Sequence, residues 1–105
     1  MKVIEAQQAF IILSQAKIEG LTVEQKYKVM NVARTLKSHA KDFEDFIKDT
    51  QEKVTDAKEQ NEIFQKEAER EIEVTFERLG ETFDKLLEIN SWNVTQAMLL
   101  EDIVK

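Results

Sequence analysis

Four glutamates at alternate positions are the residues of this chain most able to do chemistry: Glu67, Glu69, Glu71 and Glu73. Paired carboxylates can act as general acids and bases or bind metal ions. Di-metal sites in helical bundles, however, combine glutamates with histidines, and this chain has a single histidine, His39. The sequence also lacks the Asp/Asn series with a glycine that forms a loop for a hard cation. We therefore expect a solvated acidic face that binds no metal and no cofactor.

His39 is the one candidate for a base in nucleophilic catalysis. Such catalysis needs a serine or cysteine on an exposed turn, and the chain has no cysteine and no G-x-S-x-G sequence. Gly20 and Gly80 are the only glycines, too few for a phosphate-binding loop or a dinucleotide fingerprint. We therefore expect a boundary or surface histidine, and a protein that is not an enzyme.

Trp92 stands in a polar turn between two apolar segments. A ring of this size can clamp the C-terminal segments to the body of the protein. Tryptophan is also enriched at the centres of protein interfaces, so an exposed anchor for a partner is the alternative. The intramolecular clamp is the favoured interpretation.

The elements that position these residues are predicted to be helices. Apolar residues recur at steps of three and four over residues 5–18, and Gly20 can adopt the left-handed conformation that ends a helix. The sequence from Thr22 to Gln25 is typical of a capping box at the start of the next helix.

A small C-terminal unit is expected after Gly80. Apolar positions predict one short helix over residues 81–89 and a final helix over residues 94–104. Asn93, with Gln96 three residues later, is the expected cap of the final helix.

A heptad seam is the main feature of the middle of the chain. Its positions alternate steps of three and four, which favours helix packing of the coiled-coil type, within the chain or between copies. Two of them, Thr50 and Asn61, are polar, and the others are Ala33, Leu36, Ala40, Phe43, Ile47, Val54, Ala57, Phe64 and Ala68. Either one helix runs over about residues 23–70, or the chain turns near residues 49–56 and forms a hairpin. No glycine or proline marks a turn there, which favours continuity.

Residues 71–77 change the period of the pattern. Acidic residues or threonine alternate with Ile72, Val74 and Phe76, which is typical of a β-strand. A continued helix is the alternative. A strand here must pair with another strand, and this chain has no second strand pattern of equal quality. We therefore expect residues 71–77 to be a docking edge that pairs with a strand of a neighbouring copy or of another protein.

Composition limits the class of protein. The chain has 105 residues and a mass of 12.3 kDa, which indicates a single domain over residues 1–105. The net charge of −6 is divided unevenly, with +4 in residues 1–41 and −10 in the remainder. Such a chain can fold back on itself with attraction between its halves, or attach to copies of itself head to tail, and it is a poor partner for nucleic acid. No stretch resembles a membrane span or a secretory signal, so we expect a protein that is neither secreted nor bound to a membrane.

Sequences spread over most of the chain resemble a family of small, largely uncharacterised helical proteins of tailed bacteriophages. The similar segments are Ala9 to Leu13, Gln25 to Ala33, Glu71 to Phe76 and Val94 to Glu101. The chain departs from the family pattern at Leu21 to Val23, where a proline is common. The resemblance implies a phage-encoded accessory or virion component, and it carries over no catalytic residue.

Together these patterns predict a mainly α protein, a helical hairpin or bundle with one long heptad-bearing helix. We expect a non-enzymatic viral structural protein that self-associates, for example as a trimer, and contacts other virion proteins as a head, fibre or connector accessory. It would reside in the virion or the host cytoplasm. The alternative is a small acidic helical module that modulates a host or phage protein.

Overall fold

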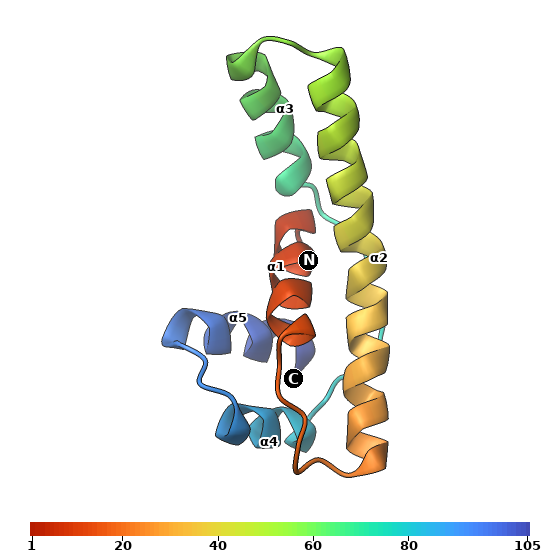
Figure 1. Ribbon diagram of the computed structural model, residues 1–105, viewed down its shortest axis with the longest axis vertical. Helices are drawn as coiled ribbons and strands as arrows, with labels where there is room; N and C mark the ends of the chain where they lie inside the picture. Colours follow the sequence, from red (N-terminus) through yellow and green to blue (C-terminus); the bar gives the residue numbers. More distant parts are fainter.

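The computed structural model describes all 105 residues, and its backbone is mainly helical, as the sequence predicts. Five helices follow one another along the chain: α1 (Val3–Ser14), α2 (Val23–Lys53), α3 (Ala57–Ala68), α4 (Glu81–Ile89) and α5 (Val94–Val104). The molecule is elongated, with extents of 48 × 24 × 21 Å, and α2 runs along nearly the whole of its long axis (Figure 1). Helices α3 and α1 lie one after the other along the same side of α2, and α4 and α5 lie on that side too, near the N-terminal half of α2 and roughly perpendicular to it.

The start of α2 is set by the capping box that the sequence predicts. Thr22 accepts a hydrogen bond from the Gln25 backbone N–H at 3.1 Å, and the Gln25 side chain accepts one from the Thr22 N–H at 2.9 Å. Gly20 makes the preceding turn at a φ of 93°, a conformation that side chains with a Cβ rarely adopt. Helix α1 runs in the opposite direction beside α2, so the two form an antiparallel pair (Figure 1).

Helix α1 is shorter than the predicted 5–18, because it ends at Ser14. The Ser14 hydroxyl donates to the Ile11 carbonyl at 2.8 Å, as a residue in a last turn can do. The next segment is then held by Asn90, whose side chain accepts from the Lys17 N–H at 2.7 Å and donates to the Lys17 carbonyl at 3.1 Å. These tertiary bonds replace the helical bonds that Lys17 would otherwise make.

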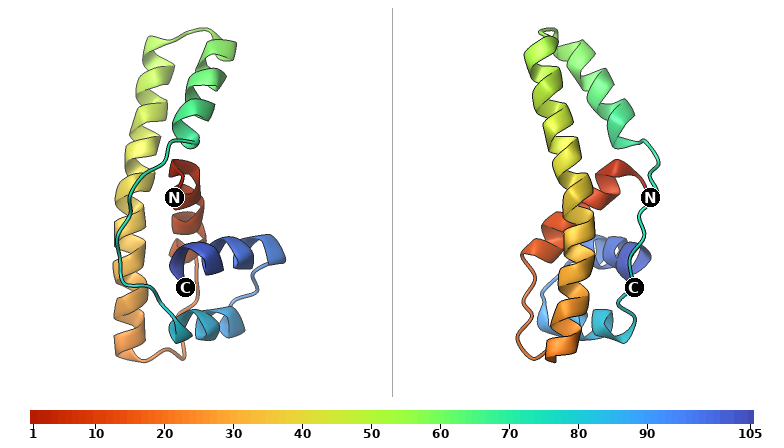
Figure 2. Two further views of the ribbon diagram at one scale, coloured as in Figure 1. Left: turned by 180° about the vertical axis from the view of Figure 1, so that it is seen from behind. Right: turned by 90° about the vertical axis from the view of Figure 1, so that its right-hand side faces the viewer.

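Of the two interpretations of residues 23–70, the structure has the hairpin and not the favoured continuous helix, because α2 ends at Lys53 and the chain turns back. Val54 is extended, and Asp56 caps α3 by accepting from the Glu59 N–H at 3.0 Å. The Gln60 side chain donates to the Val54 carbonyl and closes the turn. Polar caps thus make a hairpin without glycine or proline. The C-terminal half of α2 and the whole of α3 form a hairpin that extends away from the other helices (Figure 2). We call this hairpin the arm.

The expected strand over 71–77 is absent, although its alternation is real. Only Glu71 pairs in β fashion, as an isolated bridge with Lys2, and the chain then continues in an extended form to Gly80. The pairing stops there because residues after Lys2 enter α1, which leaves no further strand to pair with. Residues 71–79 form a strap that passes the start of α1 and the end of α5 (Figure 2).

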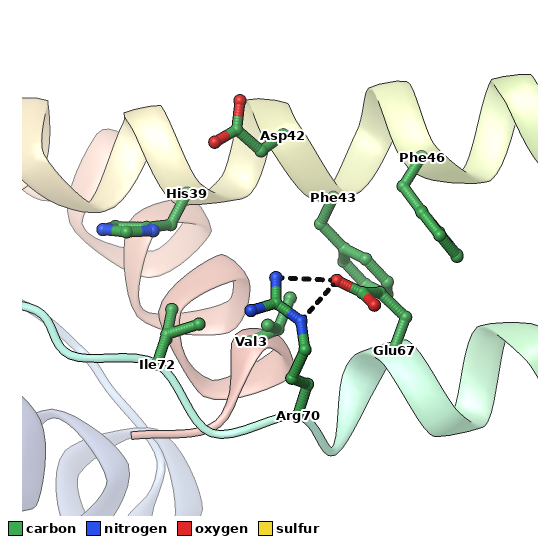
Figure 3. A pocket seen from close by; sticks show the side chains of 8 residues that line it. All are labelled: Val3, His39, Asp42, Phe43, Phe46, Glu67, Arg70 and Ile72. Carbon is green, nitrogen blue, oxygen red and sulfur yellow. Dashed lines mark hydrogen bonds and ion pairs between the residues drawn. The ribbon is translucent and has the colours of Figure 1, made fainter.

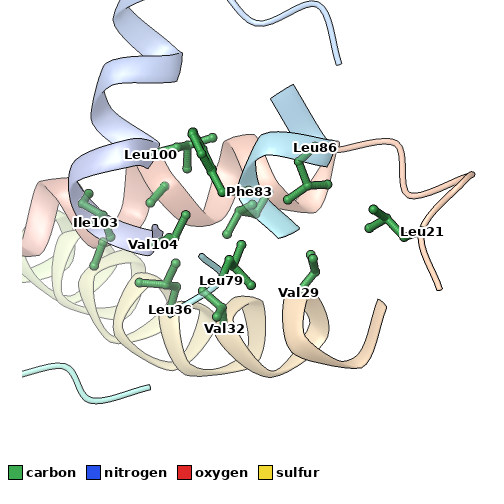
Figure 4. Packing of buried hydrophobic residues seen from close by; sticks show 13 residues of the cluster. Leu21, Val29, Val32, Leu36, Leu79, Phe83, Leu86, Leu100, Ile103 and Val104 are labelled. Carbon is green, nitrogen blue, oxygen red and sulfur yellow. The ribbon is translucent and has the colours of Figure 1, made fainter. Parts of the chain in front are cut away.

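The main core lies at the crossing of α1, α2, α4 and α5. Figure 4 shows side chains from these helices meeting in one cluster, together with Leu79 from the end of the strap. Its largest fully buried members are Phe83, Leu36, Leu86, Leu100, Val32 and Val104. No residue of α3 belongs to this cluster. The core therefore fixes one end of α2, whereas α3 lies outside it and is tied to α1 near its end, where the Val3 N–H donates to the Arg70 carbonyl at 3.0 Å. None of the five helices combines the length and apolar character needed to cross a bilayer.

Candidate interaction surfaces

The heptad seam is covered by the chain itself over most of α2. Leu36, Ala40, Phe43 and Thr50 are buried, and the Thr50 hydroxyl donates to the Phe46 carbonyl at 2.9 Å. The seam positions Ala33, Ile47, Val54, Phe64 and Ala68 are half-buried, whereas Ala57 and Asn61 on α3 are exposed. The heptad pattern therefore describes one packed face up to Thr50, and it does not continue as a seam through the turn.

The arm has a thin apolar interior. Helix α3 has no buried residue, and its two large apolar side chains, Ile63 and Phe64, are half-buried. On α2, Phe46 and Ile47 flank the buried positions and are half-buried too. An open hollow of about 430 Å³ lies between the helices, lined by Phe46, Ile63, Lys66, Glu67, Glu69 and Arg70. Apolar surface on both helices thus remains accessible beside this hollow.

No ion pair joins the two helices of the arm. Its ion pairs connect neighbours in sequence: Lys41 with Asp45 at 3.7 Å, Lys53 with Asp49 at 3.1 Å and Arg70 with Glu67 at 2.8 Å. Exposed pairs of this kind contribute little to stability. The half-buried apolar contacts are therefore the main force that holds α3 against α2.

A second, smaller cavity of about 130 Å³ brings His39 close to the acidic run (Figure 3). Arg70 extends from the end of α3 toward α2, and its Nε and Nη2 atoms each lie 2.8 Å from Glu67 Oε1. This hydrogen bond, and the charge of Glu67, raise the pKa of Arg70. His39 has no hydrogen-bond partner, and the floor of the cavity is apolar: Val3, Phe43, Phe46 and Ile72. The cavity holds no serine or cysteine that could serve as a nucleophile.

The four glutamates of the acidic run diverge. Glu67 is half-buried and pairs with Arg70, whereas Glu71 pairs with the N-terminal amine of Met1 at 3.0 Å. Glu69 and Glu73 are exposed and make no ion pair. No group of three His, Cys, Asp or Glu side chains comes together in a geometry that could hold a metal ion. The spacing in sequence therefore does not produce a common site.

The strap buries one face and exposes the other, as its alternation predicts. Ile72, Val74 and Phe76 pack against the main core, and the residues between them are exposed. Its ends are tied down: the Ile72 N–H donates to the Met1 carbonyl at 2.8 Å and the Leu79 N–H to the Val104 carbonyl at 2.7 Å. Between them, residues 73–78 make no backbone hydrogen bond. The side chains of the expected docking edge are thus used within the chain, and its backbone is unpaired.

Trp92 is half-buried and stacks on Phe83, with ring centroids 6.2 Å apart and an angle of 25° between the planes. Phe83 is 1% exposed, and the Lys105 ammonium lies 6.0 Å from the centre of its ring. The tryptophan therefore connects the turn between α4 and α5 to the core. This is the position expected of an intramolecular clamp.

Some candidate contact residues were absent from the sequence-based expectations. Phe46 and Ile63 lie one position away from the heptad seam, so a strict seam omits them. The sequence from Asp56 to Glu59 is a capping signal that identifies the start of α3, and hence the arm. Comparison of the chain with family models, with curated proteins and with solved structures found no match.

Proposed function

We propose that this chain is a non-enzymatic structural protein that associates with copies of itself through the arm. The observation that carries the proposal is the state of α3, which has no buried residue although it carries Ile63 and Phe64. A helix of 12 residues is marginal in water by itself, and most helices are stabilised by burial of an apolar face. A second copy would supply the missing cover.

The rim of the hollow in the arm supports a contact between identical surfaces. Lys66 and Arg70 lie beside Glu67 and Glu69, so the rim carries two positive and two negative side chains around Phe46 and Ile63. In a two-fold symmetric contact each patch faces its own copy, which requires a surface that complements itself. Two antiparallel arms would then form a four-helix arrangement with a shared apolar centre.

The strap offers a second contact for the same assembly. Six consecutive residues, 73–78, have unpaired backbone groups and an exposed row that includes Glu73, Thr75 and Glu77. An extended segment from a neighbour could pair with this backbone, and the glutamates would restrict which segments do so. If pairing occurs, amide exchange over residues 73–78 is slow in the assembled protein; fast exchange there removes this contact from the proposal.

We assign the assembly to a phage virion on the resemblance to small tailed-phage proteins. Purified particles test that assignment: a fixed stoichiometric number of copies per particle is expected. Absence from particles would favour the alternative function, an acidic helical module that acts on a host or phage protein. The place of the protein, in the virion or in the host cytoplasm, follows from the same measurement.

Sedimentation velocity over a range of concentrations tests self-association through the arm. The wild-type chain should gain mass as concentration rises, and Ile63→Ser or Phe46→Ser should shift it to the monomer while circular dichroism still shows a folded core. Met98→Ser is the matched control, because Met98 is 67% exposed on α5 and lies outside the arm. A wild-type chain that remains monomeric at high concentration would contradict the proposal.

A further inference from the structure

An exposed apolar row on the first half of α2 is not explained by the core or by the arm. Val23, Tyr27 and Met30 are 68%, 57% and 42% exposed. Their spacing of four and then three residues places them on one face of the helix. In the right-hand view of Figure 2 one side of α2 faces the viewer with no other helix in front of it. Three large apolar side chains in a row are more than the scattered single ones that a surface normally carries.

The same face continues with basic residues. Arg34, Lys37 and Lys41 follow Met30 at the heptad spacing and are exposed. Arg34 and Lys37 have no carboxylate within ion-pair distance. We call these six residues, from Val23 to Lys41, the outer stripe.

The charge around the outer stripe is opposite to that of the molecule. Residues 23–41 contain five basic residues and one acidic residue, Glu24, although the whole chain has 21 acidic residues and a net charge of −6. A surface with apolar residues at one end and unpaired cations at the other fits a partner of matching amphipathic and acidic character. The exposed apolar row and the negative net charge both disfavour a nucleic acid, whose binding is dominated by phosphate contacts.

We propose that the outer stripe docks an acidic amphipathic helix of a partner protein. The apolar residues of that helix would pack on Val23, Tyr27 and Met30, and its carboxylates would face Arg34 and Lys37. Parallel heptad rows on two helices give packing of this kind. The contact differs from self-association through the arm, because it lies on another face and requires a different partner.

Binding of a synthetic helical peptide tests the proposal with the full-length chain. The probe has leucines at heptad positions and glutamates on both sides of them, and its affinity is measured by fluorescence anisotropy. A basic peptide with the same leucines and an acidic peptide with scrambled leucines serve as controls. We expect the acidic amphipathic probe to bind at least about tenfold more tightly than either control, and to weaken as salt increases.

Variants of the outer stripe locate the contact. The pair Tyr27→Ala and Met30→Ala, and separately the pair Arg34→Glu and Lys37→Glu, should each weaken the probe about tenfold or more. The exposed control Lys85→Glu on α4 should leave its affinity unchanged. Because all these positions are exposed, circular dichroism should show the wild-type fold.

Three results would overturn the proposal. In the first, the acidic amphipathic probe binds no more tightly than the controls. In the second, the stripe variants bind the probe as the wild type does. In the third, the stripe variants lower the oligomeric mass, which would make this face an interface between copies.

Discussion

Replacement of Phe83 by alanine should remove a large part of the stability of the fold. Phe83 is 1% exposed and contacts both the main core and the ring of Trp92. Phe-to-Ala changes in a core cost about 3–5 kcal/mol, because burial is lost and a cavity remains. A domain of this size has a total stability of about 5–15 kcal/mol, so the change removes at least a fifth of it. At about 4 °C or more per kcal/mol, the melting temperature should fall by about 12 °C or more.

Urea unfolding followed by fluorescence measures this effect, because Trp92 is the only tryptophan. Phe83→Leu is the matched variant, with an expected cost of less than about 1.5 kcal/mol, so it stays folded if Phe83→Ala does not. A double-mutant cycle with Trp92→Leu, followed by circular dichroism because this variant has no tryptophan, should give a coupling energy of about 0.5–1.5 kcal/mol for the two rings. A loss below about 1 kcal/mol for Phe83→Ala, or no coupling, would refute the role of Trp92 as an intramolecular clamp.

Three further outcomes are expected. Phe43 is a seam residue that is 5% exposed, so Phe43→Ala should lower the free energy of unfolding by about 3–5 kcal/mol at every protein concentration. A loss of stability that is seen only at high concentration would mean that the seam packs between copies. Asp56→Ala should cost about 1 kcal/mol and reduce helical signal from α3, measured by circular dichroism and backbone chemical shifts; unchanged shifts would contradict its capping role. Asp84 raises the pKa of Lys105 by a hydrogen bond and by its charge, so this pair is intact at neutral pH and is lost as pH rises through the raised pKa. In Asp84→Asn, a titration followed by NMR should give a lower pKa for Lys105, and an unchanged value would exclude the pairing.

Local signals in the sequence were sufficient for most helix boundaries. The capping residues Thr22 and Asn93 lie where the sequence predicts them, and α4 and α5 begin and end at the expected residues. The alternation from Ile72 to Phe76 predicted one apolar and one acidic face, and the structure packs the apolar face against this chain's own core, where a docking edge for a neighbour was expected. These features depend on contacts between residues close in sequence, so a single chain is enough to read them.

The errors arose where distant residues determine the structure. The heptad pattern continues across the turn between α2 and α3, so periodicity alone does not indicate where α2 ends, and the turn is marked only by the cap at Asp56. The strap remains unpaired because only Lys2 is available opposite Glu71, which depends on where α1 begins. The end of α1 depends on Asn90, which is 73 residues from Lys17. Periodicity carries no information about such partners.

The arm hollow could not be found from the heptad seam alone. Phe46 and Ile63 occupy positions beside the seam, and only the hairpin brings them together. The outer stripe differs in this respect, because its spacing and its charge are both visible in the sequence. What the sequence leaves open is which of the two faces of α2 the rest of the chain covers.

The distance between arms in the assembled protein tests the central claim most directly. The natural chain has no cysteine, so Lys66→Cys on the rim of the hollow can carry a single spin label, and Lys85→Cys on α4 provides the matched control. Double electron–electron resonance should detect coupling between labels of two copies at position 66 at shorter distance than at position 85. Dilution with unlabelled protein should remove the coupling. If position 66 shows no coupling between copies at high concentration, or less than position 85, the proposed self-association through the arm is contradicted.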